Sequence, residues 1–313
     1  MTPGKVLVTG ASGFLGSAVV QHLARSGVPV LATARRHHGV LAQELGLPVH
    51  VLDVMGDLSA ADHLFAEAET LVHCATPNDI QSSADDGGLT LGVTGTYRLL
   101  DYAVSRGLRR VIYLSTLQVY GTELQGDVTE ATPVRCESAY SLNHYLGEEV
   151  CRLAVLRQHI DAVSLRPANV YGVPTVSTVE RTTLVPMCFV KNALATGAVE
   201  LRSSGLQRRN FVSTDEIAEI IGALIADFPK EYNIINAVSD WHASILQIVR
   251  MLQAVWRETF DEDLDLRILS AEPRNSNVFS VASAFIPPCR TRQQSEHHMG
   301  KVIKDLISHF KTS

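Results

Sequence analysis

Three glycines near the start of the chain have the spacing of a phosphate-binding turn. Gly10, Gly13 and Gly16 follow the apolar segment Lys5–Thr9 and lead into a helical pattern over residues 16–26. Glycine lets a backbone turn tightly and approach phosphate groups, and the unpaired N–H groups at a helix start attract negative charge. The order strand, turn and helix therefore predicts binding of a dinucleotide pyrophosphate rather than an ordinary tight turn.

The elements that must position this turn follow from the apolar pattern of the first half of the chain. Strand candidates alternate there with helical stretches, which is typical of a parallel sheet covered on both faces. We therefore expect an α/β fold with a doubly wound, Rossmann-type parallel sheet. The predicted strands are Lys5–Thr9, Val28–Thr33, Pro48–Leu52, Thr70–Cys74, Arg110–Ser115 and Ala162–Arg166, and the helices include Gly16–Ser26, Gly92–Arg106 and Tyr140–Gln158.

The alternation weakens after Gly172. A later strand is predicted at Asn233–Ala237, an amphipathic helix at Ala243–Arg257, and a last helix at Lys301–Phe310 after a polar stretch. We expect residues 1–172 to form a dinucleotide-binding domain, to which residues 210–240 return. Residues 173–313 would form a smaller C-terminal substrate-binding lobe, which closes over a ligand at the carboxyl ends of the strands.

Composition excludes several classes of protein. With 46% hydrophobic residues, 313 residues can bury a sizeable core, and a net charge of −6 argues against a nucleic-acid surface. No run approaches the roughly 18 apolar residues that span a bilayer, and the chain enters a strand at once, so neither a membrane segment nor a signal peptide is expected. The five scattered cysteines favour reduced thiols in a cytoplasmic protein, and no metal site is expected.

The end of the second predicted strand bears on the choice of dinucleotide. An acidic residue there usually accepts hydrogen bonds from the adenosine ribose, but this chain has Arg35 and Arg36. Guanidinium groups suit a 2′-phosphate, so NADP is favoured and NAD remains possible, unless both arginines are merely solvated. After the third strand, Asp53 can meet the adenine edge or simply cap a turn.

Three further motifs occur in order along the chain. They are Leu114-Ser-Thr-Leu-Gln-Val-Tyr-Gly121 at a strand end, Tyr140-Ser-Leu-Asn-His-Tyr-Leu-Gly-Glu148 at a helix start, and Leu165-Arg-Pro-Ala-Asn-Val-Tyr-Gly172 at the next strand end. Together with the opening glycines, they resemble the extended short-chain dehydrogenase/reductase family, which includes sugar-nucleotide epimerases, dehydratases and ketoreductases. The resemblance covers roughly residues 4–220.

The resemblance implies three catalytic positions. Tyr140 matches the family's tyrosine, a phenol that exchanges a proton with the substrate oxygen, and Thr116 matches the hydroxyl that orients this oxygen. His144 stands where the family has a lysine, four residues later on the same helix face, so little standing positive charge is expected above neutral pH. Gly92 is a second departure, because the family commonly has asparagine there.

The resemblance also implies the residues that contact ligands. Asn169 and Arg209 would contact the substrate, with Arg209 at its pyrophosphate, although Thr214 and the acidic residues after it also read as a helix cap. The expected cofactor-binding residues are Gly10, Ser12, Gly13, Phe14, Leu15, Gly16, Arg35, Arg36, Asp53, Val54, Cys74, Ala75, Thr76, Ser115, Pro167, Asn169 and Val170.

The function expected from these observations is reduction of a keto-sugar nucleotide by an NAD(P)-dependent oxidoreductase. The family's dehydratases carry Asp-Glu where this chain has Leu117-Gln118, which argues against loss of water. Sugar-nucleotide epimerisation is an alternative, and a non-catalytic dinucleotide-binding protein is another because the family lysine is His144. The resemblance further implies a homodimer that packs through helices 92–106 and 140–158.

Overall fold

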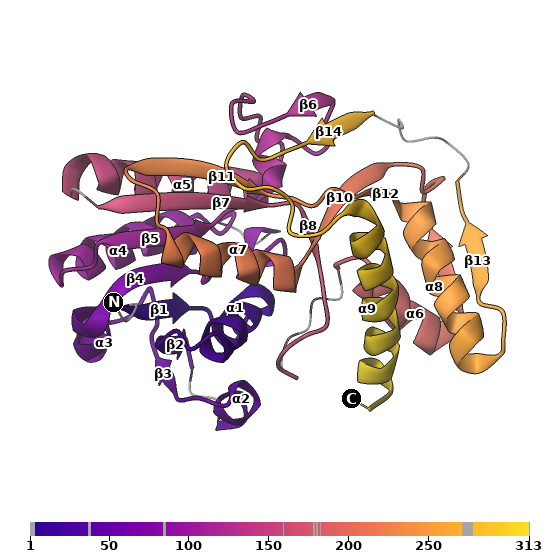
Figure 1. Cartoon of the computed structure of the whole chain (residues 1–313), viewed down its shortest axis with the longest axis horizontal. Helices are drawn as coiled ribbons and strands as arrows, with labels where there is room; N and C mark the ends of the chain where they lie inside the picture. The colour runs from indigo at the N-terminus through magenta and orange to yellow at the C-terminus, as the bar shows by residue number, and fades with distance from the viewer. Residues whose placement is uncertain are drawn as a thin grey trace.

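A seven-stranded parallel sheet forms the centre of the computed structural model, which describes residues 4–36, 39–83, 86–158, 160–177, 179, 181, 183–270 and 278–312. Its strand order is β11-β7-β5-β4-β1-β2-β3 (Figure 1). The predicted α/β class with a doubly wound sheet is confirmed. The strands are β1 (Lys5–Thr9), β2 (Val30–Ala34), β3 (Val49–Val51), β4 (Ala68–His73), β5 (Arg110–Leu114), β7 (Asp161–Pro167) and β11 (Tyr232–Ala237).

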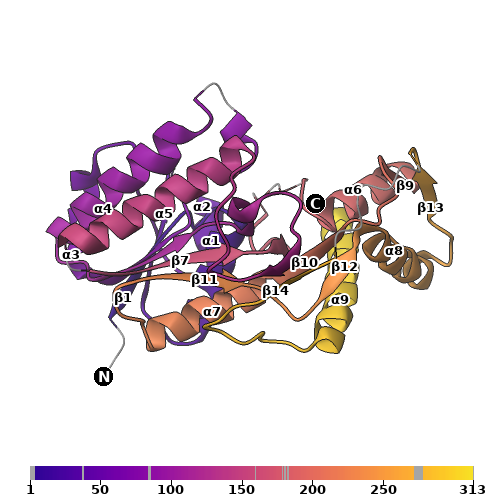
Figure 2. The same cartoon turned by 90° about the horizontal axis from the view of Figure 1, so that it is seen from above.

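Helices cover both faces of this sheet (Figure 2). Along β1, Leu7 packs in one apolar cluster while Val6 and Val8 pack in another, because successive side chains of a strand point to opposite faces. The cluster around Leu7 contains residues of α3 (Asp62–Glu67), α4 (Thr96–Ser105) and α5 (Ala139–Gln158). The other cluster contains residues of α1 (Phe14–Arg25), α2 (Gly39–Leu45) and α7 (Thr214–Ala226).

The strand order reverses at β1, which pairs with β2 on one side and with β4 on the other. Helices that start on opposite faces leave a crevice at such a point, outside the carboxyl ends of the strands, and ligands of open α/β sheets bind there. The turns after β1, β4 and β5 all open into this crevice, which brings residues distant in sequence to one place.

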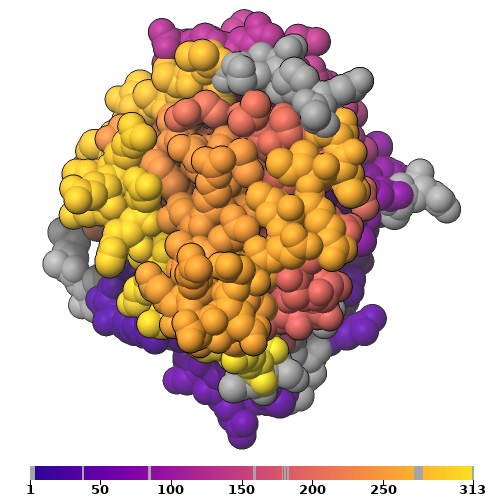
Figure 3. Space-filling view, turned by 90° about the vertical axis from the view of Figure 1, so that its right-hand side faces the viewer, coloured from indigo at the N-terminus to yellow at the C-terminus, as the bar shows by residue number. Residues whose placement is uncertain are grey.

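The C-terminal part of the chain builds the other end of the molecule, and Figure 3 shows its outer face. Its helices are α6 (Met187–Thr196), α8 (Ile245–Phe260) and α9 (Arg292–Thr312). The small sheets pair β8 (Asn169–Tyr171) with β10 (Arg208–Ser213) and β12 (His242–Ser244), β9 (Ala198–Leu201) with β13 (Asp265–Ile268), and β6 (Gly126–Val128) with β14 (Phe279–Val281). The division into lobes at residue 172 stays a prediction.

Short helices fill several connections: η1 (Leu58–Ala61), η2 (Gln81–Ser83), η3 (Thr90–Gly95) and η4 (Leu117–Tyr120). Of these, η3 is a π-helical turn that continues into α4, so the helix predicted from Gly92 has a different geometry in its first part. The last helix was predicted to start at Lys301, and this start was wrong. That helix begins at Arg292 because Thr291 and Gln294 cap it reciprocally, and the polar stretch before Lys301 is helical.

None of the helices in the described part of the chain combines the length and the apolar character needed to cross a membrane.

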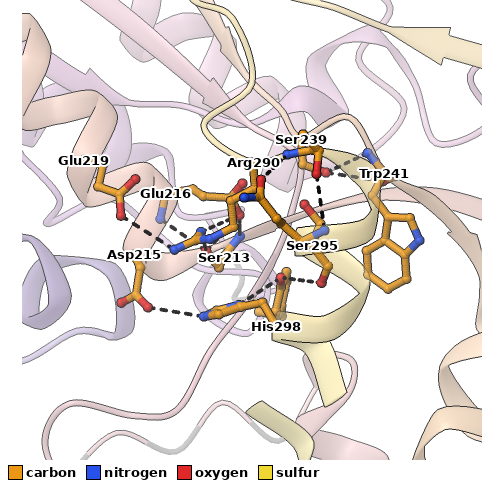
Figure 4. Close-up of polar contacts among 12 residues, drawn as sticks. Ser213, Asp215, Glu216, Glu219, Ser239, Trp241, Arg290, Ser295 and His298 are labelled. Carbon is orange, nitrogen blue, oxygen red and sulfur yellow. Dashed lines mark hydrogen bonds and ion pairs between the residues drawn. The ribbon is translucent and has the colours of Figure 1, made fainter. Parts of the chain in front are cut away.

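Polar contacts attach the start of α9 to the start of α7 (Figure 4). Arg290 donates to the Ser213 hydroxyl at 2.9 Å and lies 3.2 Å from a carboxylate oxygen of Glu216, whose side chain is only 1% exposed. Ser213 and Glu216 also form the capping box of α7, so the predicted cap lies one residue before Thr214. In the second turn of α9, His298 contacts the Tyr171 hydroxyl at 3.1 Å and Asp215 at 3.5 Å.

We expect Arg290→Met to destabilise the protein by about 1–3 kcal/mol, because the buried Glu216 carboxylate loses its guanidinium partner. Urea unfolding at neutral pH measures this change. Arg292→Met is the matched control, since Arg292 is exposed two residues later, and it should leave the unfolding free energy unchanged. Equal effects of the two substitutions would contradict a specific role of Arg290 in attaching α9.

Candidate active site

A cavity of about 810 Å³ lies at the carboxyl ends of the strands. Its volume is within the range of sites for small molecules and cofactors. It brings together residues from the turn after β1, the ends of β2, β3, β4, β5 and β7, the start of α5 and the strands β8 and β10. The sequence-predicted residues that line it are Gly10, Ser12, Gly13, Phe14, Leu15, Gly16, Arg35, Asp53, Val54, Cys74, Ala75, Thr76, Ser115, Thr116, Tyr140, His144, Pro167, Asn169, Val170 and Arg209.

The glycine turn is packed too tightly to accept side chains. Gly10 has a φ of +73°, and a Cβ there would lie 2.9 Å from the backbone of Cys74 and Ala75. A Cβ on Gly16 would lie 2.1 Å from the carbonyl oxygen of Gly10. The first turn of α1 contains no acidic residue, and its N-cap is Gly13, so no side chain caps the start of the helix. This cradle fits the pyrophosphate of a dinucleotide, because helix N–H groups face the cavity without a competing carboxylate.

The two arginines after β2 are both exposed, but only Arg35 lines the cavity. Consecutive side chains after a strand point in different directions, so only one of the pair reaches the ligand side. Asp53 also lines the cavity, and its carboxylate accepts a hydrogen bond from the Met55 N–H at 3.0 Å, as a turn-capping residue does.

Tyr140 and Thr116 meet in the cavity from different elements. Thr116 follows β5 in an extended conformation, and its hydroxyl accepts a hydrogen bond from the Gln118 N–H at 3.2 Å at the start of η4. Tyr140 lies in the first turn of α5. Burial raises the pKa of the Tyr140 phenol, and its hydrogen bond with Thr116 acts in the opposite direction. The arrangement holds a protonated phenol beside a hydroxyl, as a proton donor to a substrate oxygen requires.

His144 lies one helical turn after Tyr140, and the two rings meet edge to face with centroids 4.6 Å apart. Its side chain is 3% exposed, and burial lowers the pKa of His144 to about 4, although the backbone of Leu114 and Pro77 acts in the opposite direction. The imidazole is therefore neutral at pH 7. Its Nδ1 is buried and has no hydrogen-bond partner in the described part of the chain.

A buried ion pair fixes α5 against the sheet. Arg166 on β7 and Glu148 on α5 are each 1% exposed, and the Arg166 Nε donates to Glu148 at 2.8 Å. Ser115 also donates to this carboxylate, and the Tyr120 ring lies 4.7 Å from the guanidinium carbon. These contacts join β5, α5 and β7 at one point. They therefore set the position of Tyr140, two turns earlier on α5, relative to Thr116 beside Ser115.

Gly92 stands where the family commonly has asparagine, and the packing around it gives a physical reason for the departure. A Cβ on Gly92 would lie 2.7 Å from the Asn143 side-chain oxygen and 3.0 Å from the Pro77 ring. Asn143 is fully buried, and its amide also donates to the Gly87 carbonyl. A side chain at position 92 would therefore force the Asn143 amide, from the neighbouring helix, to shift, and glycine avoids this.

The residues expected to contact substrate lie on two paired strands. Asn169 on β8 faces Phe211 on β10, and its amide donates to the Asn210 carbonyl at 3.1 Å. Arg209 also lies on β10 and lines the cavity. The two predicted residues are therefore brought to the same wall.

Sequence reasoning missed two charged residues of the cavity, Asp79 and Arg181. They form an ion pair with 3.0 Å between the Arg181 guanidinium and a carboxylate oxygen of Asp79. Asp79 lies between β4 and η2 and belongs to none of the motifs. Arg181 belongs to no motif, so only the fold could reveal its proximity to the site.

Two buried histidines are expected to make the stability of the protein depend on pH. Burial lowers the pKa of His144 to about 4 and that of His73 to about 3. Between those values and about pH 6.5, the unfolded chain binds protons that the folded chain does not. The free energy of unfolding is therefore highest above about pH 6.5 and decreases as the pH falls. We expect the free energy of unfolding to decrease by about 2 kcal/mol for each of the two imidazoles when the pH falls from 7 to 5.

Urea unfolding at the two pH values tests this expectation. His144→Gln should remove about half of the loss, and His63→Gln, at an exposed position, should not change it. The same pH dependence in His144→Gln and in the unsubstituted protein would show that His144 is not held neutral by burial.

The parallel sheet, the glycine cradle at the strand reversal and the phenol–hydroxyl pair in the same cavity define a dinucleotide-binding α/β protein. The sequence profile of the NAD dependent epimerase/dehydratase family matches residues 6–236. The chain belongs to this family, and its resemblance to the extended short-chain dehydrogenases/reductases is confirmed.

Curated relatives include enzymes with different reactions. A dTDP-glucose 4,6-dehydratase of Streptomyces antibioticus is 33% identical over 67% of this chain, and the match covers 65% of that protein's length. A dTDP-4-dehydro-6-deoxy-D-allose reductase of a Streptomyces species is 28% identical over 80% of each chain. The solved structure of UDP-glucuronic acid 4-epimerase from Bacillus cereus, in complex with UDP-glucuronic acid and NAD, has a TM-score of 0.77 at 21% identity, with 98% of this chain and 99% of that chain covered.

Proposed function

We propose that this protein reduces the keto group of a nucleotide-activated sugar with an NAD(P) cofactor. The observation that carries the proposal is that Tyr140 and Thr116 line the same cavity as the glycine cradle. The reduced nicotinamide, when bound, supplies the hydride. Tyr140 donates the proton to the substrate oxygen, and the Thr116 hydroxyl holds that oxygen in place. Neutral His144 can hydrogen-bond the cofactor ribose but adds no charge.

Dehydration is disfavoured, although dehydratases occur among the relatives. Removal of water from a sugar needs an acid and a base beside the reacting carbons. The positions after Thr116 hold Leu117, whose side chain is 5% exposed, and Gln118, which is exposed. Neither residue type can exchange a proton at neutral pH.

For the cofactor, we propose NADP rather than NAD, with support from the residues at the end of β2. Arg35 lines the cavity, a guanidinium suits a 2′-phosphate, and β2 ends without a carboxylate. The family is NAD dependent, and the epimerase from Bacillus cereus was solved with NAD, so NAD is the alternative. Calorimetric titration with each dinucleotide decides between them, and tighter binding of NAD would contradict the choice of NADP.

The function is tested by incubating the protein with NADPH or NADH and a panel of 4-keto-sugar nucleotides. Oxidation of the reduced nicotinamide, followed by its absorbance, is expected with one or more sugars and not with the Tyr140→Phe variant. Interconversion of sugar nucleotides without net cofactor oxidation would instead indicate an epimerase. Epimerisation is the second candidate because the relatives include UDP-glucose 4-epimerases. Dinucleotide binding without turnover of any sugar would indicate a non-catalytic binding protein.

We also propose a homodimer that packs through α4 and α5. Tyr97, Leu142 and Leu156 on these helices are exposed large apolar side chains, with Leu156 at 65%. Sedimentation equilibrium tests the assembly, and Leu156→Glu should weaken it. A cytoplasmic location remains a prediction from the cysteine pattern alone.

A further inference from the structure

Proton transfer by Tyr140 is favoured by a nearby cation, and the residue of α5 that contacts its ring does not provide one. A phenol exchanges protons efficiently when a nearby cation stabilises its ionised form, and burial acts against ionisation. The imidazole against the Tyr140 ring belongs to His144, which burial keeps neutral at pH 7. A cation that supports Tyr140 must therefore come from another element of the fold.

Arg181 is placed to be this cation. It lies in the segment between β8 and α6, its side chain is 18% exposed, and it lines the same cavity as Tyr140. Its guanidinium is held by Asp79, at 3.0 Å, from the segment between β4 and η2. The ion pair thus joins two segments from different parts of the chain across the site. Because a guanidinium stays protonated at any pH that the protein survives, Arg181 supplies a permanent charge.

The groups around the phenol have opposing effects. Burial raises the pKa of Tyr140, the Thr116 hydroxyl lowers it, the Arg181 charge lowers it and the Asp79 charge raises it. Arg181 and Asp79 line the same cavity as Tyr140, and Asp79 holds the guanidinium while its own charge opposes the effect of Arg181. Arg181 and Asp79 should have opposite influences on the ionisation of one tyrosine, which a purely structural ion pair would not have.

We propose that Arg181 is the cation that activates Tyr140, in place of a cation on α5, and that Asp79 holds its guanidinium in the cavity. Arg181 acts through Tyr140 and does not itself exchange a proton. The inference rests on the proposed function in that Tyr140 is the proton-transferring group.

The test is a titration of Tyr140 in the full-length protein without cofactor or substrate. Tyrosine labelled with ¹³C at Cζ reports ionisation by NMR, and the Tyr140→Phe variant identifies the signal. We expect Arg181→Met to raise the midpoint by about 0.5–1 pH unit and Asp79→Asn to lower it by a similar amount. Arg181→Lys, which keeps the charge, should stay near the midpoint of the unsubstituted protein. Arg202→Met, at an exposed arginine outside the cavity lining, should not move it.

Two results would overturn the proposal. One is a midpoint that does not respond to Arg181→Met and Asp79→Asn, or that both substitutions move in the same direction. The other is a Tyr140 that remains protonated up to the alkaline unfolding limit in every variant, since a phenol that never ionises is not activated. Urea unfolding of each variant identifies any loss of folding.

Once a turned-over sugar is known, kinetics provide a separate result. Arg181→Met should lower kcat about 10-fold with little change in KM and move the alkaline limb of the pH profile upward. A rise in KM alone would show that Arg181 binds substrate, and would overturn the inference while leaving the proposed function intact. If no sugar is turned over, the proposed function fails, but the titration of Tyr140 still decides whether Arg181 influences the phenol.

Discussion

The Tyr140→Phe variant is expected to lose about 10²–10⁴-fold in turnover, which is the usual contribution of a positioned proton donor. The substitution removes only the hydroxyl, so the ring should keep its edge-to-face contact with His144 and its place in the first turn of α5. Dinucleotide affinity should therefore change little. Steady-state kinetics of cofactor oxidation, together with calorimetric titration of the dinucleotide, measure the two effects separately.

Tyr97→Phe is the matched control for Tyr140→Phe, because Tyr97 lies on α4 with 47% exposure and outside the cavity lining. Its turnover should equal that of the unsubstituted protein. If Tyr140→Phe retained full turnover of the same sugar, the phenol could not be the proton donor, and the catalytic role would have to move to another group of the cavity.

A second large effect is expected at the glycine cradle. In Gly16→Ala the new Cβ would lie 2.1 Å from the Gly10 carbonyl oxygen, which belongs to the backbone and cannot move aside without opening the turn. Such overpacking costs about 1–3 kcal/mol. If the cost falls on the bound state, dinucleotide affinity drops by about 10–100-fold. Calorimetric titration with NADP and NAD measures the loss.

Gly39→Ala is the control for this substitution, since Gly39 also lies in a helix but a Cβ there would meet no atom within 4 Å. It should leave dinucleotide affinity unchanged. Urea unfolding of both variants separates a damaged cradle from a general loss of stability. Unchanged affinity in Gly16→Ala would mean that the turn after β1 is not where the pyrophosphate lies.

The two departures from the family pattern have different physical consequences. Gly92 is explained by local packing, because Asn143 from the neighbouring helix occupies the space that a side chain would need. His144 changes the electrostatics, because a buried imidazole with a pKa of about 4 leaves the phenol without a cation on its own helix. The ion pair of Arg181 and Asp79 provides charge from elsewhere in the cavity.

Local sequence patterns were sufficient to predict the central sheet and the glycine turn. Apolar strands such as Lys5–Thr9 and Arg110–Leu114 were found nearly to the residue, because burial on both faces demands a continuous apolar run. The turn after β1 was predictable because its glycines are required by contacts within the motif, such as Gly16 against Gly10. Small strands such as β8 and β10 were missed, since each is short and pairs with a distant segment.

The sequence by itself determined the fold class, the dinucleotide cradle and the motif positions Thr116, Tyr140 and His144, because each depends on residue types at short, regular spacings. Only the tertiary structure decided that Arg181 and Asp79 lie in the cavity, that Asn143 fills the space at Gly92, and that Arg35 rather than Arg36 faces the ligand side. These properties depend on contacts between segments distant in sequence and on the burial that sets each group's charge, which no local pattern encodes.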